Sequence, residues 1–108
     1  MRASLTLRAA SARLTLFTRP NCGLCDTAKL RLIEVQKRRT VDYSEIDIDA
    51  AGQGQWKSVY DYDVPVLHID KSTQPQSNGS ITSLDAAKKL MHRFTVEEVE
   101  AAVDEVGT

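Results

Sequence analysis

The sequence predicts an α/β domain with one four-stranded mixed sheet flanked by helices. Two observations lead to this prediction. Short runs of strand-forming residues alternate with segments of helical periodicity, and the chain of 108 residues can build one hydrophobic core but not two. Because the formal net charge is only -1 and no apolar run approaches the roughly 20 residues that cross a bilayer, we expect neither a nucleic-acid nor a membrane partner.

The first 13 residues form a basic tail that contains three arginines and no acidic residue. This composition is typical of a mitochondrial targeting segment. A frayed tail, or an extra edge strand through residues 4–7, are the alternatives. We therefore divide the chain into a tail at 1–13 and a domain at 14–108, and expect a cytoplasmic or mitochondrial location.

The first strand is predicted over residues 14–18, where LTLFT is rich in strand formers. The breaker cluster RPN at residues 19–21 then ends the strand in a loop. From Asp26 onward a helix is predicted, because apolar side chains recur with helical spacing. Those side chains are Ala28, Leu32 and Val35.

A second strand is predicted over residues 41–48, which alternate in polarity and complete a βαβ unit. Within residues 50–62, Trp56 and Tyr60 are separated by four positions, and this spacing predicts a short helix. Residues 64–69, VPVLHI, form a buried-strand candidate with a proline at its entrance, where a missing N–H does least harm.

The remainder of the chain is predicted to contain one short strand and helical segments. Residues 71–80 are rich in Ser, Pro, Gln and Asn and predict a long surface turn, after which residues 81–82 can pair as a short antiparallel strand. A helix is predicted over residues 84–94, and the capping-box pattern TVEE at residues 95–98 begins another. The predicted order is β-α-β-α-β-β-α, with the last helical region in two pieces.

The chemistry-bearing feature is the CxxC motif of Cys22 and Cys25. A cysteine attacks disulfides only as a thiolate, and an unperturbed thiol with a pKa of about 8.5 is a few per cent ionised near neutral pH. Cys22 falls where the loop meets the helix, so the free N–H groups and the positive dipole of the helix start face its sulfur. Arg19 adds a nearby cation, and together these groups would lower the pKa of Cys22 to about 3.5–7.5.

We infer that Cys22 is the nucleophile and that Cys25, one helical turn behind it, is the resolving thiol of a redox disulfide. A structural disulfide across so short a loop would stabilise little. No metal site is predicted, because only His68 and His92 remain as further ligands and their spacing is not that of a zinc finger.

Other residues receive no catalytic role from the sequence. His68 lies within a predicted strand and His92 late in a predicted helix, where structural histidines are common. Trp56, Tyr60 and Tyr62 either pack in the core or line a groove beside the cysteines.

The segments LTLFTRPNCGLC and YDYDVPVLHID, joined by a βαβ unit, resemble glutaredoxins and in particular the small glutaredoxin-like proteins of fungi and other eukaryotes. The resemblance covers residues 14–94. It depends on Arg19, three positions before the first cysteine, and on Val64-Pro65 at the start of the third strand. It implies a thioredoxin/glutaredoxin-like fold in which the Val64-Pro65 peptide bond is cis and lies against the sulfurs.

The resemblance further implies that Arg19, Val64 and Pro65 bind glutathione or another substrate and that glutathione is the reductant. Some relatives share an iron-sulfur cluster between two subunits, but two cysteines alone do not support one, so we expect no bound cofactor. Two departures imply that glutathione binding is weak or lost. Gly23-Leu24 stands where the family usually has Pro-Tyr, and the family's Gly-Gly-acid segment is replaced by SNGSITSLD at residues 77–85.

We therefore expect a monomeric thiol-disulfide oxidoreductase that reduces protein or glutathione mixed disulfides. A non-catalytic adaptor that binds proteins through residues 56–62 is one alternative. A weak metal-binding module that uses Cys22, Cys25 and one histidine is another.

Overall fold

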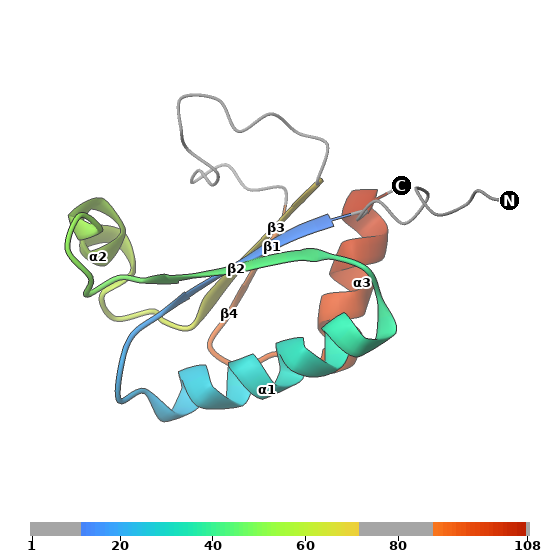
Figure 1. The fold of residues 1–108 in the computed structure, drawn as a ribbon, viewed down its shortest axis with the longest axis horizontal. Coiled ribbons are helices and arrows are strands. Elements are labelled where there is room, and N and C mark those ends of the chain that lie inside the picture. The colour runs from blue at the N-terminus through green and yellow to red at the C-terminus, as the bar shows by residue number, and fades with distance from the viewer. Residues whose placement is uncertain (1–11, 72–87, 108) are drawn as a thin grey trace, which may run out of the picture.

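A computed structural model describes residues 12–71 and 88–107 of the chain (Figure 1). Within these residues the elements follow the predicted order. They are β1 (Ala12–Thr18), α1 (Gly23–Arg38), β2 (Asp42–Asp47), α2 (Gly54–Tyr60), β3 (Val66–Lys71), β4 (Lys88–Met91) and α3 (Val96–Gly107). The predicted α/β fold with a four-stranded mixed sheet flanked by helices is confirmed.

The sheet has the strand order β2-β1-β3-β4. β1 runs parallel to β2 and antiparallel to β3, and β3 runs antiparallel to β4. Every residue of β1 is buried because the strand is central, whereas the edge strand β2 is partly exposed. β1 begins at Ala12, so Ala12 and Arg13 of the predicted tail belong to the sheet.

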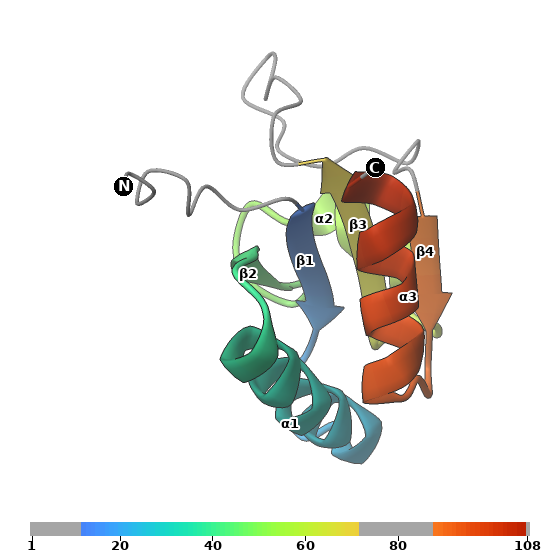
Figure 2. The ribbon, with the colours of Figure 1, turned by 90° about the vertical axis from the view of Figure 1, so that its right-hand side faces the viewer.

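The main hydrophobic core lies between one face of the sheet and the pair α1 and α3, which lie along that face (Figures 1 and 2). Alternate residues of β1, Leu14 and Leu16, point into this core, as the two-residue repeat of a strand requires. The helices contribute their apolar stripes, which recur every three or four residues. The buried members from the helices are Ala28, Leu32, Val35, Val99, Ala102, Val103 and Val106.

The opposite face of the sheet carries a second, aromatic core beneath α2. Phe17 of β1 packs against Trp56 with ring centroids 4.6 Å apart and against Tyr60 at 5.2 Å. Val66 and Ile48 complete this cluster. Trp56 and Tyr60 are therefore core residues, and of the three aromatics considered for a groove only Tyr62 is exposed, at 93%.

The helix predicted over residues 84–94 is wrong where the structure describes it, because Lys88–Met91 forms β4. These residues are good helix formers, but β3 offers an open edge and Leu90 pairs with Leu67 there. Pairing with a distant strand has overridden local propensity. The predicted last helix is confirmed as α3, and its capping box forms, with the Glu98 N–H donating to Thr95 Oγ1 at 3.0 Å.

Several sequence predictions lie outside the described residues. They concern the segment at residues 4–7, the strand at 81–82, the SNGSITSLD segment at 77–85 and the turn predicted at 71–80, apart from its first residue, Lys71, which ends β3.

Candidate functional site

The two cysteines lie where β1 leads into α1, as the sequence predicts. After Thr18 the chain turns through Asn21, which adopts a left-handed backbone with φ of 59°, a conformation that asparagine tolerates well. Cys22 is the N-cap residue of α1, with an extended backbone, and the helix begins at Gly23, three residues before the predicted position. This turn brings Cys22 to the amino-terminal end of the helix.

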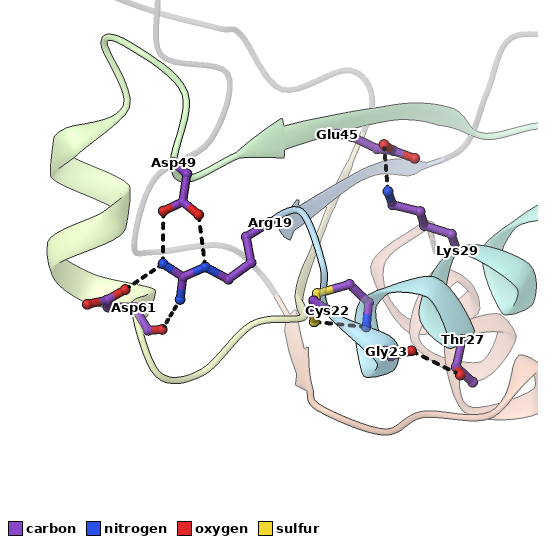
Figure 3. The surroundings of a disulfide bond; sticks show 9 residues. Arg19, Cys22, Gly23, Thr27, Lys29, Glu45, Asp49 and Asp61 are labelled. Carbon is purple, nitrogen blue, oxygen red and sulfur yellow. Dashed lines mark hydrogen bonds and ion pairs between the residues drawn. A yellow bond between two sulfur atoms is a disulfide. The ribbon is translucent and has the colours of Figure 1, made fainter.

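Cys22 and Cys25 form a disulfide, with their Cα atoms 5.2 Å apart (Figure 3). The Cys25 side of the bond is 0% exposed, whereas Cys22 is only partly buried. The backbone N–H of Cys25 donates to Cys22 Sγ at 3.1 Å. The cap position thus supplies a hydrogen bond and the positive end of the helix dipole to the more accessible sulfur.

Arg19 extends from the β1–α1 loop toward two carboxylates (Figure 3). Its Nε and Nη2 donate to the two carboxylate oxygens of Asp49 at 3.1 and 2.8 Å, and Nη2 also donates to Asp61 at 2.8 Å. These charge-assisted bonds raise the pKa of Arg19, and with Lys57 they hold the pKa of Asp49 well below its usual range. The guanidinium therefore joins the loop to the segment around α2.

Asp49 and Asp61 are site residues that the sequence did not reveal. They lie 30 and 42 positions from Arg19, and no local motif connects them with it. The guanidinium of Arg19, predicted as a cation beside Cys22, is thus directed at two carboxylates (Figure 3).

Val64 and Pro65 immediately precede β3, and the peptide bond between them is cis, as the resemblance implies. Because Phe17 pairs with Val66, the chain that leaves β1 and the chain that enters β3 meet at the same end of the sheet. The Pro65 carbonyl accepts a hydrogen bond from the backbone N–H of His92 at 2.8 Å. This contact ties the end of β4 to the turn that holds the proline.

His68 is a residue of β3 whose ring lies in the aromatic core beneath α2. It is fully buried, as a structural histidine would be. Its Nε2 shares a 2.7 Å hydrogen bond with the Tyr60 hydroxyl, while Nδ1 finds no partner among the described residues. Burial, with a smaller repulsion from Lys89, lowers the pKa of His68 to about 4. His92 is half-exposed and lies 3.7 Å from Asp63.

Within residues 12–71 and 88–107, no three His, Cys, Asp or Glu side chains lie close enough together to hold a metal ion. In the same part of the chain, no helix combines the length and the apolar character needed to span a bilayer.

Solved structures similar to this chain share its fold. A structural-genomics target protein from X. campestris is 24% identical, with a TM-score of 0.58 over 85% of this chain and 96% of that one. Thioredoxin O2 from Arabidopsis thaliana in its oxidised state is 17% identical, with a TM-score of 0.60 over 90% and 76%. The N21Q mutant thioredoxin from Halobacterium salinarum is 13% identical, with a TM-score of 0.67 over 94% and 80%.

At these identities the neighbours establish a thioredoxin-like fold and nothing finer. The family is shown by the sequence, because the model of the Glutaredoxin-like domain (DUF836) matches residues 13–104. With its CxxC pair at the start of α1, the chain therefore belongs to the family of the Glutaredoxin-like domain (DUF836).

Proposed function

We propose that this protein is a thiol-disulfide oxidoreductase in which Cys22 attacks the substrate and Cys25 resolves the intermediate. The observation that carries the proposal is the division between the two sulfurs. Cys22 caps α1, is partly accessible and accepts the N–H of Cys25, whereas Cys25 is completely buried. A sulfur that accepts a backbone N–H at a helix start is stabilised as a thiolate, which is the attacking species.

The reaction begins with the reduced protein. The Cys22 thiolate attacks one sulfur of a substrate disulfide, forms a mixed disulfide and releases the other sulfur as a thiolate. Cys25 then loses its proton and attacks Cys22, which releases the second substrate thiolate and forms the Cys22–Cys25 disulfide. Two electrons pass to the substrate, and two glutathione molecules or one dithiol return them to the protein while becoming a disulfide.

Glutathione is the proposed reductant, and Arg19, Val64 and Pro65 are the proposed substrate-binding residues. The cis peptide of Val64-Pro65 at the end of the sheet that carries Cys22 supports this assignment. Protein and glutathione mixed disulfides are the proposed substrates of a monomer without bound cofactor, in the cytoplasm or the mitochondrion.

Single cysteine variants test the proposal sharply, because the chain contains two cysteines and each variant retains one. Cys22→Ser should abolish reduction of a small disulfide such as hydroxyethyl disulfide. Cys25→Ser should retain glutathione-dependent turnover, since a second glutathione can release the adduct on Cys22, but it should accumulate a stable adduct with a protein disulfide. Absence of turnover in the unmodified protein, with glutathione or with a dithiol, would favour the non-catalytic adaptor.

The ionisation of Cys22 provides an independent measurement. In the Cys25→Ser variant, the pH dependence of iodoacetamide labelling should give Cys22 a pKa below about 7.5. The matched Cys22→Ser variant should label slowly, because Cys25 is buried. A Cys22 pKa near the unperturbed value of about 8.5 contradicts the proposed activation.

A further inference from the structure

A groove with a volume of about 290 Å³ runs alongside α1 from the cysteine motif. One wall is a single helical stripe, because its members are spaced at i, i+3, i+4 and i+7. They are Leu24, Thr27, Ala28 and Arg31. The other wall is the connection between β4 and α3, formed by His92, Arg93 and Phe94.

One wall begins within the cysteine motif, and the other begins beside the cis peptide at the same end of the sheet. Leu24 stands between the two cysteines in the sequence, so the α1 wall starts within the motif. His92 is held by its backbone hydrogen bond to the carbonyl of Pro65, at the cis peptide. A polypeptide joined to Cys22 through a disulfide can therefore continue directly into the groove.

The groove is lined by two arginines, one on each wall. Arg31 and Arg93 are exposed on opposite walls, and neither forms an ion pair within residues 12–71 and 88–107. By contrast, Arg19 is held by Asp49 and Asp61. Among the residues that the structure describes, Asp63 brings an acidic side chain to the groove, 3.7 Å from His92. Two guanidinium groups without partners favour a ligand that carries carboxylates.

The length of the groove indicates what kind of ligand carries these carboxylates. From Leu24 to Arg31 the helix advances seven residues, or about 10 Å at about 1.5 Å per residue. An extended chain covers about 3.3 Å per residue, so about three residues are needed to span that distance from a cysteine bound at Cys22. Glutathione has only one residue on each side of its cysteine, which is too short to reach Arg31.

We propose that this groove binds an acidic segment of a protein substrate, with Arg31 and Arg93 pairing with carboxylates about three residues from the target cysteine. The inference rests on the proposed oxidoreductase function and names its substrate class. Arg31 and Arg93 are then specificity-determining residues, and they act on protein disulfides rather than on glutathione.

A binding measurement tests the groove without any redox step. The probe is a fluorescent peptide with serine in place of the target cysteine and with Asp and Glu about three positions after it, and a matched peptide carries Lys at those positions. Fluorescence anisotropy should show about tenfold tighter binding of the acidic peptide, as expected for two exposed ion pairs. Arg31→Glu with Arg93→Glu should remove the preference. Lys37→Glu, the same reversal of charge at an exposed position near the end of α1, should keep it.

Turnover measurements separate this inference from the proposed function. Acidic and basic peptide disulfides, glutathione disulfide and hydroxyethyl disulfide are compared in the unmodified protein and in the arginine variant, with circular dichroism to verify folding. The arginine variant should lose the preference for the acidic peptide and keep its rate on hydroxyethyl disulfide.

Equal binding of both peptides, or a preference that survives both arginine substitutions, overturns the groove assignment while leaving the oxidoreductase proposal intact. An equally large loss on glutathione disulfide assigns the arginines to glutathione and also overturns it. Selective binding of the acidic peptide without turnover of any disulfide supports the groove and refutes the oxidoreductase.

Discussion

Protonation of His68 should destabilise the folded protein as the pH falls below neutrality. The side chain is completely buried between Phe17, Trp56 and Tyr60. It can accept a hydrogen bond from the Tyr60 hydroxyl only while one ring nitrogen is unprotonated. Burial, followed by repulsion from Lys89, lowers its pKa from 6.5 to about 4. In the unfolded chain the ring regains the ordinary pKa, so the unfolded state binds a proton that the folded state excludes.

The size of the effect follows from the shift. The contribution of neutral His68 is fully present above about pH 6.5 and is lost progressively as the pH falls toward about 4. Over this window of about 2.5 pH units, at about 1.4 kcal/mol per unit, the free energy of unfolding should fall by about 3 kcal/mol.

Urea unfolding of the oxidised protein at a series of pH values measures this loss. The reference is the double variant Tyr60→Phe/His68→Phe, which replaces the hydrogen-bonded pair with two apolar rings and removes the titrating group. Above pH 4, the difference in free energy of unfolding between the two proteins should change with pH. Titration of the carboxylates is common to both proteins and cancels in this difference. His92→Gln, at a half-exposed histidine, controls for the loss of a histidine side chain outside the aromatic core. A slope that persists in the double variant would refute the reasoning.

Three further predictions concern the scaffold and the loop beside the cysteines. Leu32→Ala should lower the free energy of unfolding by about 2–5 kcal/mol because Leu32 is fully buried, whereas Leu30→Ala on the same helix, 66% exposed, should change it little. Thr95→Ala removes the side-chain cap of α3 and should cost about 1 kcal/mol in urea unfolding. Arg19→Gln removes two charge-assisted bonds from Asp49 and should raise the pKa of that carboxyl toward about 3.9 in an NMR titration.

Each of these predictions has a contradicting result. Equal losses for the two leucine variants would mean that the core is not where the buried stripe of α1 places it. A Thr95→Ala variant with unchanged stability would show that the cap contributes nothing to α3. An unshifted pKa of Asp49 in Arg19→Gln would mean that Lys57 alone, whose Nζ lies 2.6 Å from that carboxylate, sets its ionisation.

Much of the cysteine site could be predicted from the sequence, because the features that form it are local. Breaker residues between a strand and a helical repeat predicted the junction that carries Cys22, and the helix dipole and free N–H groups there depend only on the first turn of α1. The capping box of Thr95 and Glu98 lies within one turn, so its residue types alone predicted the start of α3. The cis state of Val64-Pro65 came from family resemblance, since local preference favours trans.

The order of the elements, the position of the redox motif and the apolar faces that pack together could be predicted from the residues, because periodicity and capping act over a few positions. Three features emerge only in the folded chain: Lys88–Met91 pairs with β3 as a strand, Arg19 is held by Asp49 and Asp61, and Arg31 and Arg93 line one groove. Strand pairing and ion pairing depend on which distant segments the sheet brings together. Residue type and local spacing do not indicate which distant segments become neighbours in the fold.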